Sequence, residues 1–201
     1  ERGLGHLHRL AGRPVPTGIE IAKAYFSEAS LACNRGELSG PQFLDALAAQ
    51  LGVPQLPRPV LAEAWCDIFT PWPEMESLAA RLLAAGHRAF LLSNTDPVHF
   101  GWLSPRMPVL GRLDGLFLSY EAGFIKPDPA FFTQALARFG LDPGGCLFLD
   151  DRADNVETAR SVGLRAFQIR GDAQEAERFL RAEGVALAAD DSGPAAGPQK
   201  S

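Results

Sequence analysis

The first third of the chain has apolar residues at helical spacing. They recur every three or four positions, as in the run Phe43, Leu44, Leu47 and Leu51. Ser39 is followed by Gly, Pro and Gln42, which is the pattern of a capping box with proline in the first turn. We therefore predict a helix over about 41–51 that stops at Gly52, within a helical region that extends from about residue 4 to 72.

After residue 72 the pattern changes to alternating strands and helices. Short continuous apolar runs, typical of buried parallel strands, predict strands over about 89–92, 116–118, 146–149 and 166–169. Amphipathic stretches between them predict helices over about 74–85, 129–139, 155–162 and 173–183. Repeated strand–helix units of this kind indicate an α/β domain with a Rossmann-like parallel sheet.

The pattern divides the chain into three parts. We predict a small helical lobe over 1–73, a Rossmann-like core over 74–189 and a disordered tail over 190–201. The tail consists of Gly, Pro, Ala, Ser and charged or amide residues without a large apolar side chain, so it cannot offset the entropy cost of ordering. A chain of 201 residues can bury one substantial core and support a small second lobe.

Composition narrows the class of partner. No apolar run approaches the roughly 20 residues that span a bilayer, which predicts no membrane association. The net charge of −5 provides no basic surface for a phosphate backbone, which argues against nucleic acid as a partner. The three cysteines form no C-x-x-C pair and are interpreted as reduced thiols in a cytoplasmic protein. Because the chain opens with Glu1 rather than methionine, we expect it to be a fragment.

Polar residues that suit phosphate follow two of the predicted strands. Ligands of open parallel sheets bind beyond the carboxyl ends of the strands. Ser93 can donate its hydroxyl, and Asn94 its backbone N–H, to phosphate oxygens, and Lys126 offers an ammonium that can neutralise a phosphoryl group. The structural alternatives are a polar strand-to-helix turn and a solvated loop lysine.

A pair of carboxylates follows the third predicted strand. Asp150 and Asp151 are adjacent, and neighbouring carboxylates repel each other unless a cation compensates them. With Asn155 one helical turn further on, these oxygen ligands suit a Mg²⁺ ion that keeps several waters. The alternative is a helix N-cap with acidic residues in the first turn.

The order of these groups is more informative than any one of them. A strand-end Ser, a Lys and an acidic pair before a helix occur in sequence, each about one strand–helix unit apart. Over about 74–170 the chain resembles the haloacid dehalogenase superfamily, in which these are the second, third and fourth motifs. The helical lobe more loosely resembles the cap of that family, which closes over the active site and selects the substrate.

The resemblance implies roles for the site residues. Ser93 and Lys126 would be catalytic and, with Asn94, would hold the phosphoryl group of a small phosphomonoester. Asp150, Asp151 and Asn155, all in the fourth motif, would form the Mg²⁺ site. Asp151 would be the direct ligand, and its neighbour would bridge to the lysine or to water.

The family mechanism also requires a first motif that this chain does not contain. In the family, the first aspartate of a D-x-D motif attacks phosphorus to form an aspartyl-phosphate, and the second acts as acid and base. The first sixty residues contain one aspartate, Asp45, which falls in a predicted helix. We therefore predict no nucleophile in this chain and an inactive protein as it stands, although the complete protein would be a hydrolase of phosphoric monoesters.

Loss of the first strand also has a structural consequence. In the family this strand lies in the middle of the sheet, here between the strands that end at Ser93 and Asp150. We expect two interior strand edges without partners, which is unfavourable because backbone groups and sheet edges need pairing.

Two other functions remain open. A haloacid dehalogenase also attacks through an aspartate, but such enzymes need no magnesium and do not keep the paired acids, so Asp150 and Asp151 favour phosphate hydrolysis. A non-catalytic phosphate-binding module would keep Ser93 and Lys126 without turnover. The sequence does not indicate the substrate or the oligomeric state.

Several aromatic and histidine residues lie near the predicted junction of the two lobes. We interpret Trp65, Phe69 and Trp72 as hinge packing, with lining of a substrate cleft as the alternative. His99 follows a proline turn without a carboxylate or cysteine at ligand spacing, so we expect no metal-binding role for it.

Overall fold

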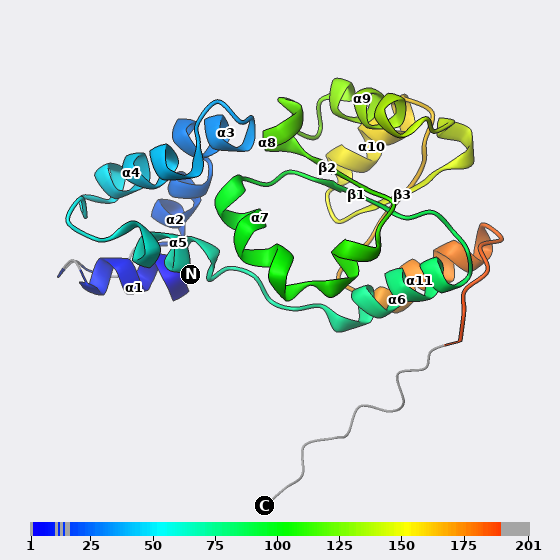
Figure 1. The fold of residues 1–201 in the computed structure, drawn as a ribbon, viewed down its shortest axis with the longest axis horizontal. Coiled ribbons are helices and arrows are strands. Elements are labelled where there is room, and N and C mark those ends of the chain that lie inside the picture. The colour runs from blue at the N-terminus through cyan, green and yellow to red at the C-terminus, as the bar shows by residue number, and fades with distance from the viewer. Residues whose placement is uncertain (1, 11, 13, 15–16, 190–201) are drawn as a thin grey trace, which may run out of the picture.

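The computed structural model describes residues 2–10, 12, 14 and 17–189. A lobe of helices lies beside an α/β core, and helix α7 (Pro97–Leu103) lies between the two (Figure 1). The disorder predicted for 190–201 concerns residues outside this description.

The N-terminal lobe is helical, as predicted. Its helices are α1 (Arg2–Leu10), α2 (Gly18–Tyr25), α3 (Glu28–Asn34), α4 (Gly40–Leu51) and α5 (Arg58–Cys66). The predicted boundaries of α4 are confirmed, because the Ser39 N–H donates to Gln42 Oε1 at 2.9 Å and Gly52 ends the helix in the left-handed region with φ 67°.

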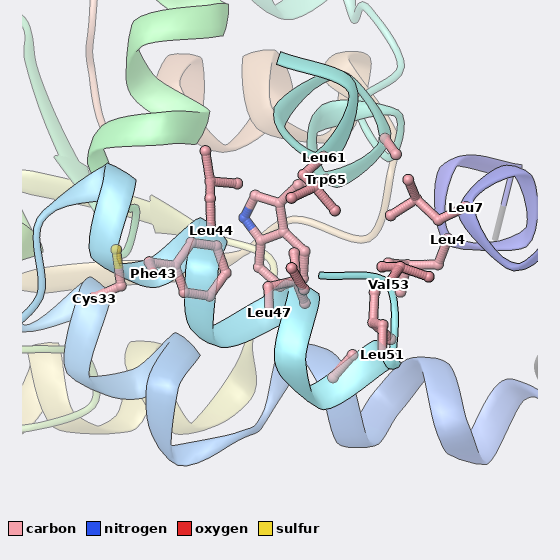
Figure 2. Packing of buried hydrophobic residues seen from close by; sticks show 13 residues of the cluster. Leu4, Leu7, Cys33, Phe43, Leu44, Leu47, Leu51, Val53, Leu61 and Trp65 are labelled. Carbon is pink, nitrogen blue, oxygen red and sulfur yellow. The ribbon is translucent and has the colours of Figure 1, made fainter. Parts of the chain in front are cut away.

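This lobe has its own hydrophobic core, centred on Trp65 of α5 (Figure 2). Trp65 is 1% exposed and stacks on Tyr25 with ring centroids 4.2 Å apart. Phe43 of α4 also contacts Trp65, with ring centroids 4.9 Å apart and the rings tilted by 58°. The indole therefore joins α2, α4 and α5 and fixes the position of α5 within the lobe.

The C-terminal part is an α/β core with helices on both faces of its strands (Figure 1). Strand β1 (Phe90–Ser93) pairs in parallel with β2 (Gly115–Leu118), and β3 (Leu147–Asp150) pairs in parallel with β4 (Arg165–Gln168). Helices α6 (Pro73–Ala84) and α11 (Ala173–Ala182) cover one face, and α9 (Pro129–Phe139) and α10 (Ala153–Ser161) cover the other. The four predicted strands and four predicted helices are all confirmed to within two residues at each end.

Shorter elements complete the core. Helix α8 (Ser119–Ala122) follows β2, and short 3₁₀-helices occur at Ser104–Arg106, Pro108–Arg112 and Pro143–Gly145. The pattern of apolar residues does not predict these elements or α7, because each is too short to show a helical period.

Strand β1 has one paired and one unpaired edge. The backbone groups of alternate residues in a strand point to the same side. The Ala89 carbonyl accepts a hydrogen bond from the Asp114 N–H at 2.8 Å, on the β2 side. The backbone groups of Phe90 and Leu92 therefore point away from β2, toward β3.

Strand β3 presents a matching edge. The Asp150 carbonyl accepts from the Ile169 N–H at 2.9 Å, beyond the end of β4, so the backbone groups of Leu147 and Leu149 point away from β4. Within the part of the chain that the structure describes, the strands form two separate two-stranded sheets, and neither of these edges pairs with a third strand. This agrees with the expectation of a missing central strand.

The two lobes approach each other closely where α3 meets α8. The Cβ of any residue other than glycine at position 36 would lie 2.0 Å from the Tyr120 carbonyl oxygen, and Gly36 also has a positive φ of 74°. A side chain at this position would both clash and strain the backbone. Glycine thus allows backbone-to-backbone contact between the lobes.

On the face of the core opposite α9 and α10, an ion pair ties α6 to α11. Arg81 donates to both carboxylate oxygens of Glu177 at 2.8 and 3.1 Å, and Arg181 also donates to Glu177. The Arg81 hydrogen bonds, followed by those of Arg181, lower the pKa of Glu177 from 4.5 to about 2.

We expect Glu177→Gln to lower the free energy of unfolding by about 1 kcal/mol at pH 7. Because the pKa of Glu177 is lower in the folded protein, its contribution is fully present above about pH 4.5 and is lost as the pH falls toward 2. Urea denaturation from pH 7 to pH 2 should therefore show wild type and variant converging in acid. The control is Glu157→Gln, at an exposed position on α10. If wild type and Glu177→Gln differed by the same free energy of unfolding at every pH, the lowered pKa of Glu177 would be contradicted.

Two general properties of the chain are also evident. All three cysteines are free, and Cys33 and Cys66 are buried, which agrees with their interpretation as unpaired thiols. Among the described residues, no helix has the length and apolar character needed to cross a bilayer.

Candidate active site

Lys126 and Asp150 meet between the carboxyl ends of β1 and β3. Lys126 Nζ lies 2.6 Å from Asp150 Oδ2 and donates to the Leu92 carbonyl at 2.9 Å. The two side chains are only 9% and 6% exposed. The ammonium therefore joins the unpaired edge of β1 to the carboxylate at the end of β3, and two of its three protons are engaged by the protein.

The second oxygen of Asp150 is also fully engaged. Oδ1 accepts from the Arg152 N–H at 2.9 Å and from Asn155 Nδ2 at 2.8 Å. With Lys126 on Oδ2, the carboxylate is surrounded by protein donors. This geometry fits a carboxylate that bridges to the lysine better than one that binds a metal directly.

Asn94 holds the lysine loop against the end of β1. Its Nδ2 donates to the Lys126 carbonyl at 2.8 Å, and its Oδ1 accepts from the Lys126 N–H at 2.7 Å. A side-chain amide offers a donor and an acceptor together, so it can pair with one residue's backbone in this way. The sequence predicts Asn94 as a phosphate ligand through its backbone N–H, but it gives no sign of this side-chain clamp.

Ser93 and Asp151 have available polar atoms. Ser93 is the last residue of β1, opposite Leu118 of β2, and its hydroxyl makes no hydrogen bond with any residue that the structure describes. Asp151 follows β3 and is exposed, and its carboxylate likewise has no hydrogen-bond partner within the described ranges. Each is free to meet a ligand at the carboxyl ends of the strands.

A cleft of about 530 Å³ opens beside the acidic pair. It is lined by Asp150 and Asp151 together with Trp72 and Arg170, and by three further residues, Leu149, Ile169 and Gly171. Trp72 thus lines a cleft and also packs against the core cluster that contains Leu78.

The residues present offer oxygen ligands that fit Mg²⁺. Asn155 is 2% exposed, and its Oδ1 is a buried side-chain oxygen without a hydrogen-bond partner. A buried unpaired oxygen is unfavourable unless something else binds it. Together with the free carboxylate of Asp151 it provides hard ligands of the type that magnesium prefers. The described residues contain no group of three acidic, histidine or cysteine side chains that could hold a metal, so water or phosphate would have to supply further ligands.

Separate comparisons with known proteins agree on one family. The model of the haloacid dehalogenase-like hydrolases matches residues 18–163. The chain is 30% identical over 140 residues to a D-ribitol-5-phosphate phosphatase of Bacteroides thetaiotaomicron, covering 66% of this chain and 67% of that protein. It is 30% identical over 141 residues to a phosphoserine phosphatase of Thermus thermophilus, covering 68% of this chain and 56% of that protein.

Solved structures show the same fold. A HAD family enzyme of Bacteroides thetaiotaomicron, in complex with magnesium and inorganic phosphate, has a TM-score of 0.73 at 22% identity and covers 85% of this chain and 86% of its own. An L-2-haloacid dehalogenase of Xanthobacter autotrophicus has a TM-score of 0.58 at 21% identity and covers 92% of this chain and 78% of its own. These likenesses establish the predicted α/β fold with a Rossmann-like core.

Proposed function

Because the chain belongs to the haloacid dehalogenase-like hydrolase family, we propose that its site serves the magnesium-dependent hydrolysis of small phosphomonoesters. The observation that carries this proposal is the buried pair of Lys126 and Asp150 between the carboxyl ends of β1 and β3, with the free carboxylate of Asp151 beside it. A fixed ammonium next to an available carboxylate suits a ligand that is an anion accompanied by a divalent cation.

Each site residue has a part in this proposal. Lys126 keeps one ammonium proton for a phosphate oxygen, since Leu92 and Asp150 take the other two. Ser93 donates its free hydroxyl to a second oxygen. Asn94 contributes its backbone N–H, while its side chain holds the lysine loop in place.

Asp151 and the unpaired oxygen of Asn155 would hold the magnesium ion. When bound, the ion neutralises negative charge on the phosphoryl group. Asp150 would then act through Lys126 and not as a direct ligand.

The division of the chain follows from this role. Residues 1–73 form the cap that selects the substrate, and residues 74–189 form the core that binds phosphate. Trp72 and Arg170 line the cleft beside the acids, and we propose that they contact the part of the substrate that leaves. The free thiols support a reducing compartment such as the cytoplasm.

The attacking aspartate is not supplied by these 201 residues, whose sequence contains no D-x-D motif. Among the described residues, the edges of β1 and β3 that face away from β2 and β4 pair with no third strand. We propose that such a strand carries the nucleophile and that the chain alone does not turn over substrate. The second candidate is a phosphate-binding module without catalysis. The lack of a D-x-D motif in the sequence favours this candidate as well.

Binding of inorganic phosphate tests the site independently of turnover. We expect Mg²⁺ to strengthen phosphate binding to the wild-type chain by about tenfold in calorimetric titrations. Asp151→Asn should remove this effect of magnesium, because the free carboxylate is lost. Asp154→Asn is the matched control, since Asp154 lies in the next turn and pairs with Arg152 instead. An equal magnesium effect in Asp151→Asn and wild type would overturn the metal assignment.

A further inference from the structure

A buried carboxylate joins the two lobes three residues after Ser93. Asp96 is fully buried and forms the N-cap of α7, where its Oδ1 accepts from the N–H groups of Val98 and His99, each at 2.8 Å. These two bonds are sufficient to cap the helix. The other oxygen, Oδ2, is therefore available for a second purpose.

That second oxygen is bound from the helical lobe. Trp65 Nε1 donates to Asp96 Oδ2 at 3.1 Å, and His99 Nδ1 lies 2.8 Å from the same oxygen. His99 Nε2 lies 3.1 Å from the Trp65 carbonyl, and the two rings stack with centroids 5.1 Å apart and planes 5° from parallel. Trp65 thus contacts this pair through its indole N–H, its ring and its backbone.

This cluster corrects one expectation from the sequence. His99 does have a carboxylate partner, because the N-cap geometry of α7 turns the side chain of Asp96 toward it. Trp65 packs against His99 of α7 at the junction of the lobes, and a hinge at this junction stays a prediction.

The pKa of Asp96 is lowered, which favours the ionised carboxylate that accepts from His99 and Trp65. Burial by itself would raise the pKa of this carboxyl group, but the hydrogen bonds and charge of His99, together with the Trp65 donor, outweigh it and hold the pKa below the usual value. A buried ionised carboxylate that loses one of these donors is strongly disfavoured. The three side chains therefore keep their geometry together.

The turn between β1 and α7 is fixed residue by residue. Asn94 is clamped to Lys126, and the Thr95 N–H and carbonyl are both bound by the Ser119 hydroxyl at 2.9 and 2.8 Å. Those contacts lie within the core. Within this turn, the side chain of Asp96 is the one that reaches the helical lobe, through its contact with the Trp65 indole.

We propose that Asp96 and His99 are positioning residues, through which Trp65 of the helical lobe sets the turn that carries the phosphate ligands Ser93 and Asn94. This inference rests on the proposed function for the phosphate role of the turn, but the link between the lobes stands on its own geometry. Phosphate affinity would then depend on the docking of the lobe as well as on the ligands themselves.

Asp96→Asn separates this role from helix capping. Asparagine is as good an N-cap as aspartate, so its Oδ1 keeps the start of α7. Its amide nitrogen cannot accept from the Trp65 indole N–H, so the contact with the lobe is lost. The matched control is Asp172→Asn, because Asp172 is an exposed N-cap that accepts from the Gln174 N–H at 2.8 Å.

Hydrogen exchange and phosphate titration provide the two readouts. We expect Asp96→Asn to speed amide exchange by about tenfold in residues 93–95 and in α5 together, and to weaken binding of inorganic phosphate by about tenfold. Asp172→Asn should change neither. A folded Asp96→Asn protein with wild-type exchange in both segments would overturn the proposal.

Trp65→Phe keeps the test decisive if Asp96→Asn does not fold. This variant retains an aromatic ring in the core of the lobe and removes the indole donor. We therefore expect the same faster exchange in 93–95 and α5 and the same weaker phosphate binding. Wild-type exchange at 93–95 would refute the link between Trp65 and the turn. If the wild-type chain bound no phosphate, the proposed function would fail, while the exchange measurement would still decide whether the lobes are linked.

Discussion

Replacing Lys126 by methionine is expected to lower the free energy of unfolding by about 3–5 kcal/mol, because it leaves a buried carboxylate without its cation. Asp150 has a 6% exposed side chain, and Lys126 Nζ lies 2.6 Å from its Oδ2. Methionine preserves most of the aliphatic side chain, so lost charge and not lost packing accounts for the effect. Urea denaturation at neutral pH measures it.

The double variant Lys126→Met/Asp150→Asn shows whether the pair itself is responsible. Removing the uncompensated charge should restore most of the lost stability, whereas binding of inorganic phosphate should stay lost because the ammonium is absent. Lys23→Met, at an exposed position of α2, is the control and should leave both quantities unchanged. If Lys126→Met were as stable as wild type, the buried ion pair would not exist as described.

The second large effect concerns turnover. The 201-residue chain is expected to give no hydrolysis of an aryl phosphate, even with excess magnesium, because no aspartate of its sequence stands in a D-x-D motif. Mixing the chain with a synthetic peptide, an apolar strand that ends in Asp-x-Asp, should produce hydrolysis at least roughly 10⁴-fold faster, since the peptide supplies the nucleophile. The unpaired edges of β1 and β3 provide backbone groups to bind such a strand on both sides.

Two controls make this result specific. A peptide with asparagine in place of both aspartates should bind without turnover. Asp151→Asn in the chain should abolish the restored magnesium-dependent activity and leave the fold intact. Robust turnover by the chain alone, reproduced in independent preparations, would refute the claim that the nucleophile is missing.

Local features of this fold could be predicted from the sequence because they depend on near neighbours. Helix α4 follows from Ser39, Gln42 and Gly52, all within one short segment. The four strands follow from continuous apolar runs, and their ends place Ser93 and Asp150 at one edge of the core.

Contacts between distant segments could not be predicted in the same way. The clamp between Asn94 and Lys126 joins residues 32 positions apart, and the Trp65–Asp96 contact spans 31 positions and two lobes. No periodicity encodes either contact, because each depends on how the elements pack. The sequence feature that comes nearest to predicting the second contact is Asp96 before Pro97, with His99 three residues after the aspartate.

The open edges of β1 and β3 also have a consequence for how the chain behaves when concentrated. The two edges belong to different strands, so pairing β1 of one copy with β3 of another joins unlike surfaces and leaves a free edge at each end. Such head-to-tail association continues from copy to copy into open polymers unless its rotation closes a ring. We therefore expect light scattering from this chain to rise steeply with concentration, with growing polymers in place of a defined oligomer.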